Sequence, residues 1–201
     1  MAGRPRGVDD AVILRAAVDV MGRVGPAKLT LALVAREVGL VPGTLVQRFG
    51  SKRGLLLALA AHSAADTEQL AADLRAAHDS PLDVLAAFLA ALHAPMTTPE
   101  AYAHHLAFLC ADLADDEFRA RALAAEQDHA ARVTGLLAEA ADAGLLRPGT
   151  DPAALAATVR AATTGCGVLW AVDRRGTLLD RLRTTLDAVL APHLAHPQED
   201  A

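Results

Sequence analysis

The sequence predicts an all-α fold. Two observations support this prediction: the composition, and the positions of glycine and proline between the apolar segments. Of the 201 residues, 53% are apolar but only 3% are aromatic, so alanine and leucine, which favour helices, supply most of the hydrophobicity. Charged residues make up 21%, too few for a chain that stays disordered. Glycine and proline interrupt the apolar segments, which indicates helices joined by short loops. A chain of this length forms one or two domains.

Four helices are expected in the first third of the chain, and a residue suited to begin a helix stands just before each helix or in its first turn. These residues are Asp9 or Asp10, Thr30, Pro42 and Ser51. Gly25-Pro26, Gly39 and Gly50 mark the breaks, and the fourth helix runs into the seventies. Five further helices are expected over residues 81–94, 99–114, 116–144, 152–172 and 176–194.

The charge is divided unevenly along the chain. Residues 1–62 contain nine lysines and arginines against four acids, a net charge of +5, whereas the remainder carries ten basic and twenty acidic residues, a net charge of −10. A basic segment on an acidic remainder is the asymmetry expected if only the first segment meets phosphate. An uneven but ordinary solvated surface is the alternative.

Residues 30–49 have the spacing of a helix-turn-helix. Ala35 is small where the two short helices would cross, and Gly39 can adopt the left-handed conformation that redirects the chain. Four apolar residues would hold the second helix against the first: Val34, Val38, Leu45 and Phe49. Thr44, Gln47 and Arg48 then project outward, where they suit the base edges of a major groove. A helical hairpin with a polar outer face remains open as an alternative.

A composite pattern makes this segment more specific. It combines Gly39, Gly43-Thr44-Leu45, Phe49, Ser51-Lys52 and Leu55-Leu56. With these residues, the chain from about Val8 to Ala60 resembles the DNA-binding domain of the TetR/AcrR family of transcriptional regulators. The resemblance implies a helix-turn-helix DNA-binding domain over residues 1–61, an effector-binding and dimerisation domain over 62–196, and a tail over 197–201.

The resemblance also implies roles for individual residues. Thr30 and Lys52 would contact phosphates, and Pro42 and Gly43 would bring the recognition helix, with Thr44, Gln47 and Arg48, against the DNA. Val46 stands where the family usually has an aromatic residue, and Ala32 where some members have a polar base reader, so Gln47 and Arg48 are the expected base readers.

An arginine-containing arm precedes the first helix. Arg4 and Arg6 could follow a minor groove, whose negative potential attracts arginine. A disordered basic tail is the alternative in the absence of DNA.

The last helices are expected to form a dimer interface. The segment from Thr164 to Asp173 and the helix after it look like the last two helices of many family members. One apolar stripe on the final helix suits a four-helix interface between two copies: Leu178, Leu179, Leu182, Leu186, Val189 and Leu190. Burial of this stripe within one chain is the alternative.

The middle helices would enclose an effector pocket, as the resemblance implies. The candidates are the larger or polar side chains of otherwise alanine- and leucine-rich helices: Phe88, Leu92, Met96, Tyr102, His105, Leu109, Cys166 and Trp170. Taken singly, each of them is more often plain core than a ligand contact. Together they predict a small, mainly hydrophobic effector.

Two rival functions remain at the level of sequence. Glu126 and His129 form a Glu-x-x-His pair, and Glu100 and His104 lie one turn apart, so a helical-bundle metal-binding protein or enzyme is the alternative function. A helical dimer that uses its basic segment for protein contacts is the other. We find no second Glu-x-x-His pair and no phosphate loop or nucleophile motif, and we expect no enzymatic activity, no cofactor and no metal.

The chain is expected to be cytoplasmic, with a double-stranded DNA operator, a small-molecule effector and a second copy of itself as partners. Its N-terminus has no apolar segment typical of a secretion signal, and no uninterrupted apolar run is long enough for a membrane helix. The two cysteines, Cys110 and Cys166, lie too far apart in sequence for a Cys-x-x-Cys pair.

Overall fold

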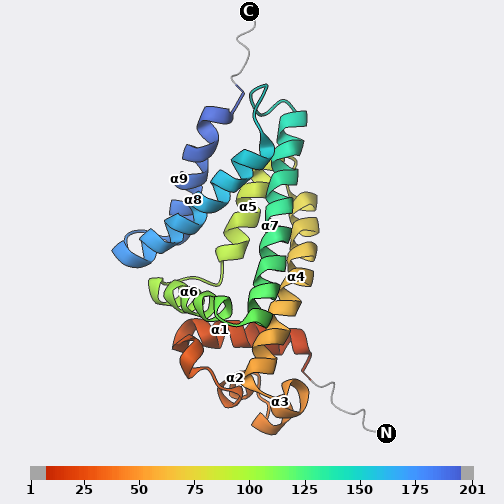
Figure 1. Ribbon diagram of the computed structural model, residues 1–201, viewed down its shortest axis with the longest axis vertical. Helices are drawn as coiled ribbons and strands as arrows, with labels where there is room; N and C mark the ends of the chain where they lie inside the picture. The colour runs from red at the N-terminus through yellow and green to blue at the C-terminus, as the bar shows by residue number, and fades with distance from the viewer. Residues whose placement is uncertain (1–7, 196–201) are drawn as a thin grey trace, which may run out of the picture.

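The structure confirms the all-α prediction. A computed structural model describes residues 8–195, apart from the side chains of residues 63–66 and 111–112, and within this range the chain forms helices and no strand. The helices are α1 (Asp10–Lys28), α2 (Leu31–Glu37), α3 (Pro42–Phe49), α4 (Lys52–Ala77), α5 (Pro81–His93), α6 (Pro99–Leu113), α7 (Asp116–Asp142), α8 (Pro152–Asp173) and α9 (Leu178–Leu190), followed by a short 3₁₀ turn over Ala191–His193 (Figure 1).

Helix α1 differs from its predicted end. The sequence predicts that it stops at Gly25-Pro26, but a further helical turn continues to Lys28 beyond a kink. Gly25 at the kink has φ 80°, a conformation open to a residue without a Cβ atom, and Pro26 lacks the N–H that a continuous helix would use. The break is therefore real but bends the helix instead of ending it.

The helices form a small head and a larger body. We use "head" for α1, α2, α3 and the first turns of α4, and "body" for the rest of α4 with α5–α9 (Figure 1). Helix α4 is continuous from one part into the other, so the predicted boundary between residues 61 and 62 falls inside it. The division at that residue stays a prediction, and the predicted tail over 197–201 lies outside the described residues.

Each part has its own apolar core. In the head, α1, α2, α3 and α4 meet around residues that are fully buried: Ile13, Ala17, Val34, Ala35, Leu45 and Leu55. In the body, α5, α7, α8 and α9 meet around a second set: Leu85, Phe88, Leu137, Val159 and Leu186. The two cores are joined by the continuous helix α4 and by the contact between α1 and α6. A movement of α4 or α6 in the body can therefore shift the head.

Helix α8 is long and rich in apolar residues. Among the described residues, it is the one helix long and apolar enough to cross a membrane by length and composition. It packs against α6, α7 and α9, and Leu155, Val159 and Trp170 on it are buried among them. A packed helix of a helical bundle meets the same length and composition criteria.

Candidate nucleic-acid interface and effector cavities

The turn between α2 and α3 has the geometry that the helix-turn-helix pattern predicts. The Thr30 side chain caps α2 by accepting a hydrogen bond from the Leu33 N–H at 3.2 Å. Gly39 has φ 68°, and the Leu40 N–H donates to the Ala35 carbonyl at 2.8 Å, which closes the end of α2. Helices α2 and α3 lie at the end of the molecule opposite the last residues of α9 (Figure 1).

Helix α3 presents its outer face to solvent. Leu45 is fully buried against the head core and Phe49 packs beside it, so the intervening residues point away from the core. Pro42, Gly43 and Gln47 are exposed, and Thr44 is half-buried. Val46 is exposed too, which places an apolar group on the face that the resemblance assigns to DNA.

Arg48 has an intramolecular partner that the sequence did not predict. Its guanidinium pairs with the Asp10 carboxylate at 2.9 Å and donates to the Val8 carbonyl. These contacts tie the end of α3 to the start of α1. In the described structure Arg48 therefore braces the recognition helix, and reading a base would require it to exchange these partners.

Lys52 is likewise engaged within the head. Its ammonium donates to the carbonyls of Pro26 and Ala27, the latter at 3.2 Å, at the end of α1. A cation at a helix C-terminus satisfies carbonyls that have no partner within the helix. Lys52 therefore fixes the start of α4 against the end of α1, a role that its position after Ser51 did not reveal.

Three other head cations are more available than Arg48 and Lys52. Arg15, Lys28 and Arg36 are exposed, and none of them forms an ion pair with another described residue. These residues are not among the predicted DNA contacts, because those follow the family pattern position by position. The even spread of basic residues through the head was the signal that could have included them. The predicted arm residues Arg4 and Arg6 lie outside the described residues.

The body contains a cavity of about 310 Å³ between α4, α5, α7 and α8. Two predicted effector-pocket residues, Leu92 and Met96, line it. Its polar lining includes Thr67, His93, His129, Arg160 and Thr163. The cavity is thus more polar than the eight predicted pocket residues suggested. The polar residues of α7 and α8 that line it were not among those eight.

The other pocket candidates are distributed over different places. Phe88 is buried in the body core with its ring edge-on to His129, and Tyr102 and Trp170 pack edge to face at a centroid distance of 6.4 Å. Cys166 lies in a surface groove between α8 and α9, and His105 and Leu109 line a separate cavity near the head. The structure therefore does not bring the eight predicted side chains into one pocket.

Burial lowers the pKa of two histidines in the body cavity. For His93 the burial outweighs a hydrogen bond between its Nδ1 and the Leu89 carbonyl at 2.8 Å. For His129 the burial outweighs the nearby carboxylates of Glu126 and Asp128. A lowered pKa favours neutral rings, which can donate and accept hydrogen bonds within the cavity.

Four of the six residues in the apolar stripe on α9 are buried within the chain, contrary to the prediction that they form a dimer interface. Leu178, Leu182, Leu186 and Leu190 are buried in the chain's own cores, so they are not available as a dimer surface. Val189 is half-buried against the body core, and Leu179 is 49% exposed. The stripe was assigned to a dimer because periodicity shows which residues share a face but not which neighbour covers it.

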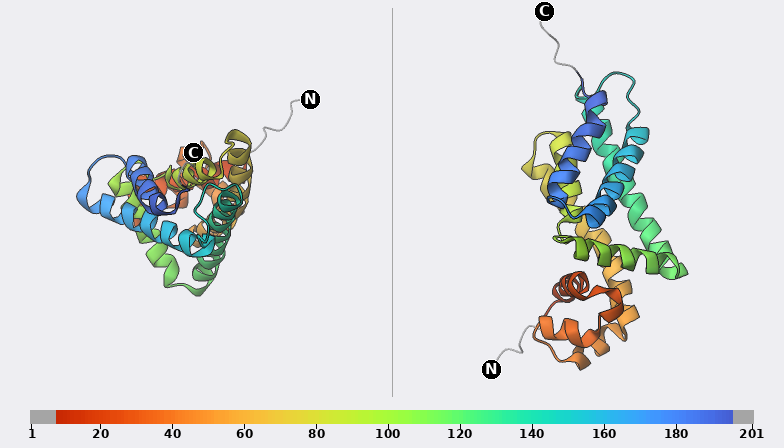
Figure 2. Two further views of the ribbon diagram at one scale, coloured as in Figure 1. Left: turned by 90° about the horizontal axis from the view of Figure 1, so that it is seen from above. Right: turned by 90° about the vertical axis from the view of Figure 1, so that its left-hand side faces the viewer.

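The exposed apolar side chains of α8 and α9 lie elsewhere. Leu169 is 63% and Val172 76% exposed, three residues apart on α8, and α8 and α9 lie side by side along one flank of the body (Figures 1 and 2). A groove of about 650 Å³ between the two helices includes Leu169 and the small residues Ala162 and Gly165. Apolar side chains so exposed on one flank mark a candidate surface for protein association.

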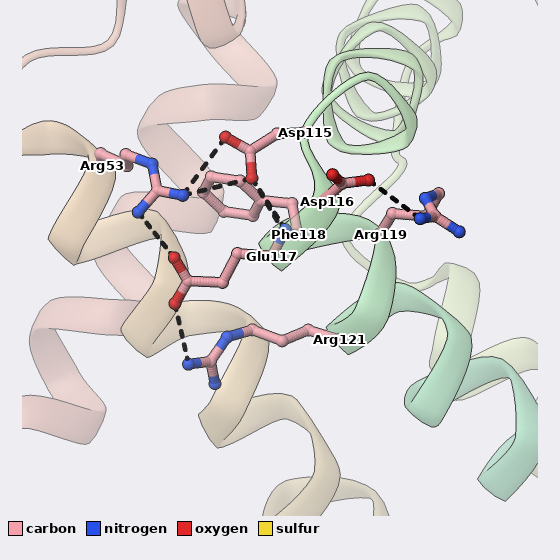
Figure 3. A network of polar contacts seen from close by, with 7 residues as sticks. All are labelled: Arg53, Asp115, Asp116, Glu117, Phe118, Arg119 and Arg121. Atoms are coloured by element: carbon pink, nitrogen blue, oxygen red, sulfur yellow. Dashed lines mark hydrogen bonds and ion pairs between the residues drawn. The ribbon is translucent and has the colours of Figure 1, made fainter.

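The head and the body meet through polar contacts as well as through apolar packing. His104 on α6 bonds through Nδ1 to the Gly22 carbonyl of α1 at 2.7 Å. Arg53 on α4 reaches Asp115 at 3.2 Å and Glu117 at 2.8 Å, and its guanidinium lies 5.3 Å from the centre of the Phe118 ring (Figure 3). Helices α6 and α7 of the body therefore hold α1 and α4 of the head.

The residues of the metal alternative are engaged in other contacts. Glu126 pairs with Arg160, Glu100 pairs with Arg174 at 2.7 Å, and His104 holds α1. No group of three or more potential ligands that could hold a metal ion occurs within the described part of the chain. Both cysteines are free thiols.

Comparison with known proteins identifies the class of molecule. Residues 13–59 match the family model described as bacterial regulatory proteins, tetR family, and residues 81–195 match the BetI-type transcriptional repressor, C-terminal, model. The fold and these matches define a DNA-binding transcriptional regulator. Because the second model alone spans more than half of the chain, the chain belongs to the TetR family.

Solved structures of this fold are similar over nearly the whole chain. SmeT, the repressor of the Stenotrophomonas maltophilia multidrug efflux pump SmeDEF, is 23% identical with a TM-score of 0.66, covering 94% of this chain and 92% of that one. A transcriptional regulator from Saccharomonospora viridis in complex with choline is 18% identical with a TM-score of 0.73, covering 93% and 98%.

FadR from Bacillus subtilis in complex with stearoyl-CoA is 17% identical with a TM-score of 0.64, covering 91% of this chain and 98% of that one. At these identities the likeness concerns the fold. A comparison with curated proteins finds no match.

Proposed function

We propose that this TetR-family regulator is a cytoplasmic homodimeric repressor that binds a (pseudo)palindromic operator and is released by a small, mainly hydrophobic effector. The observation that carries the proposal is the exposed outer face of α3 on a basic head, joined by one continuous helix to a body with its own cavity. We retain the predicted division into a DNA-binding domain over 1–61 and an effector-binding and dimerisation domain over 62–196.

In the proposed complex, α3 enters the major groove with its N-terminus first. Pro42, Gly43 and Thr44 approach the backbone and the bases, Gln47 reads adenine, and Thr30 contacts a phosphate. The exposed Lys28 and Arg36 supply further phosphate contacts. Arg48 and Lys52 contact DNA only on exchanging their present partners, whereas as braces they keep α3 and α4 in place.

The proposed effector occupies the body cavity. A cavity of about 310 Å³ lies at the lower end of the range of about 300–1,000 Å³ typical of ligand sites. Leu92, Met96 and Val133 would contact its apolar part, and His129 and Thr163 its polar group. The relatives bound to choline and to stearoyl-CoA show that this fold accommodates ligands of very different size.

The proposed dimer uses the exposed flank of α8 and α9. Leu169 and Val172 would be covered by the matching surface of a second copy, since a twofold interface uses the same surface on both copies. Two heads held at one spacing would then match two operator half-sites.

The proposed release follows from the connection between the parts. Thr67, which lines the effector cavity, lies on α4, and Arg53 near the start of α4 belongs to the contact with α7. An effector that displaces α4 would therefore shift the head and change the separation of the recognition helices. Its effect depends on different affinities for the two states, with a coupling of about 1–3 kcal/mol.

Selection of bound fragments from genomic DNA by the purified protein tests this function. We expect enrichment of one motif with two inverted half-sites, and neighbouring genes that indicate the effector class. A protein that enriches no motif, in parallel with a control selection that lacks protein, would contradict the proposal. Stoichiometric iron, manganese or zinc in the purified protein would instead support the metal-binding alternative.

A further inference from the structure

A second cavity lies where the head meets the body. It has a volume of about 290 Å³ and is bounded by α1, α4, α6 and α7, whereas the proposed effector cavity lies between α4, α5, α7 and α8. Most of its wall is apolar, formed by Val18, Met21, Leu59, Phe108 and Leu109. We call it the joint cavity.

Two residues that line the joint cavity each have a buried polar atom without a partner. The two atoms are Nε2 of His105 on α6 and Nε of Arg121 on α7, and neither has a hydrogen-bond partner among the described residues. Buried polar groups in proteins are nearly always paired, so two such groups in the wall of one cavity call for an explanation. An acceptor that enters the cavity from outside would supply the missing partner to both.

The charges around the joint cavity leave Arg121 available. Its guanidinium contacts Glu117 through Nη2 at 3.4 Å, but Glu117 is held more closely by Arg53 at 2.8 Å (Figure 3). Glu126 also lines the cavity, and its carboxylate is already paired with Arg160 on α8. Each acidic group near Arg121 therefore has another cationic partner, and Nε of Arg121 has none.

His105 can provide the second donor. Burial, followed by the neighbouring His104, lowers the pKa of His105, so its ring is neutral near pH 7 and can carry its proton on Nε2. Two donors on adjacent helices match the two oxygens of a carboxylate better than the single oxygen of an alcohol or a carbonyl.

We propose that the joint cavity binds a small carboxylic acid with an apolar body, such as a medium-chain acid. When the two side chains turn toward the cavity, its carboxylate accepts hydrogen bonds from Nε of Arg121 and from Nε2 of His105, and its chain packs against Met21, Phe108 and Leu109. The small volume excludes long acyl chains. Because the ligand would touch α1 and α4 as well as α6 and α7, it would bias the position of the head, a consequence that rests on the proposed function.

Calorimetric titration of the full chain with octanoate tests the site independently of DNA. We expect one octanoate per chain, and binding of octan-1-ol that is weaker by about tenfold or more, because a charge-assisted bond is lost. Arg121→Met should weaken octanoate binding by a similar factor. Arg119→Met, on the same helix but exposed and paired with Asp116, is the matched control and should change it by less than about twofold.

Three outcomes would overturn the proposal: no heat of binding up to about 10 mM octanoate, equal binding of acid and alcohol, or unchanged binding by Arg121→Met. Loss of binding in Leu92→Trp, which fills the effector cavity, with binding retained in Arg121→Met would assign the acid to that other cavity.

If Arg121→Met does not fold, the imidazole NMR signals of His105 in the unaltered protein show whether octanoate binds in the joint cavity. They should shift at saturating octanoate, and unchanged signals would contradict the site. An absence of operator binding would overturn the proposed function but leave these results intact.

Discussion

At the scale of residues, the long cationic side chains of the head show what a sequence can and cannot reveal. Arg48 and Lys52 occupy positions of the motif that contact DNA in the family, so the resemblance implies that they are DNA ligands. In the structure, Arg48 binds Asp10 and Lys52 binds the end of α1. A partner 38 residues away in the sequence is set by the packing of α3 against α1, which no local pattern records.

The pair Arg48→Ala and Asp10→Ala separates bracing from base reading. Arg48→Ala should relax base preference by about 1–3 kcal/mol at one operator position if the side chain exchanges Asp10 for guanine. Asp10→Ala should keep that preference, since it removes only the intramolecular partner. Both changes should alter stability by less than about 1 kcal/mol because the pair is exposed. Fluorescence anisotropy with single-base operator variants measures the preference.

A preference in Arg48→Ala equal to that of the unaltered protein at every position would show that Arg48 only braces α3. An equal loss of preference in both variants would show that the ion pair itself is what specific binding requires.

The buried histidines predict the pH dependence of stability. His93, His105 and His129 have lowered pKa values because of burial, so below about pH 6.5 the unfolded chain takes up protons that the folded chain does not. The free energy of unfolding should therefore fall as the pH decreases from about 7.5 to about 5.5. Urea unfolding across this range measures it.

His129→Gln should flatten this dependence, because one proton-binding difference between the two states is removed. The exposed His78→Gln is the matched control and should leave the slope as it is. A steeper slope in His129→Gln, or stability that rises toward lower pH, would contradict the account.

At the scale of elements, the start of each helix could be predicted more surely than what covers its surface. Thr30, Ser51 and Asp115 cap helices through their own side chains, so the sequence carries the information locally. The leucines of α9 carry a clear period, but the period does not show that α8 and the distant helix α5 cover them. Four of the six residues of the stripe are therefore buried by the chain itself, whereas Leu179 is exposed.

The crossing of α6 and α8 depends on one glycine. A Cβ atom on Gly167 would lie 2.4 Å from the Tyr102 ring, which is itself buried and donates through its hydroxyl to the Thr164 carbonyl at 3.2 Å. Gly167→Ala should therefore destabilise the protein by about 1–3 kcal/mol through overpacking. Thermal or urea unfolding of the variant measures this loss.

Gly135→Ala in α7 is the matched control. Nothing lies within 4 Å of its would-be Cβ atom, so alanine there should stabilise the helix by about 0.5–1 kcal/mol. Equal effects of the two substitutions would show that the contact with Tyr102 does not limit the packing of α8.

At the scale of the whole molecule, the net charge of −5 is a poor guide to the partner, because a basic head is attached to an acidic body. The fold class could be predicted from the composition and from the positions of glycine and proline. The class of function could be predicted from the uneven distribution of charge along the chain and from one composite motif. The effector cavity could be predicted only in part, since its lining combines α4, α5, α7 and α8, whose register against one another is set by packing.

The exposed flank of α8 and α9 predicts the oligomeric state. Leu169→Arg combined with Val172→Arg should convert a dimer into a monomer, because two charges would be buried without partners. Leu123→Arg on α7, a leucine of similar exposure, is the matched control and should leave the dimer intact. Analytical ultracentrifugation measures the mass, and a dimer that survives the double change would place the interface elsewhere.

The basic head is proposed to bind operator DNA through phosphate contacts and base contacts together. The affinity of the full-length protein for the selected operator, measured by anisotropy as a function of salt concentration, tests this binding mode. We expect a linear fall of log K with log salt, with a loss of about a thousandfold between about 50 and 200 mM if about six phosphates are contacted. An affinity that does not change with salt would show that the head does not bind DNA in this way.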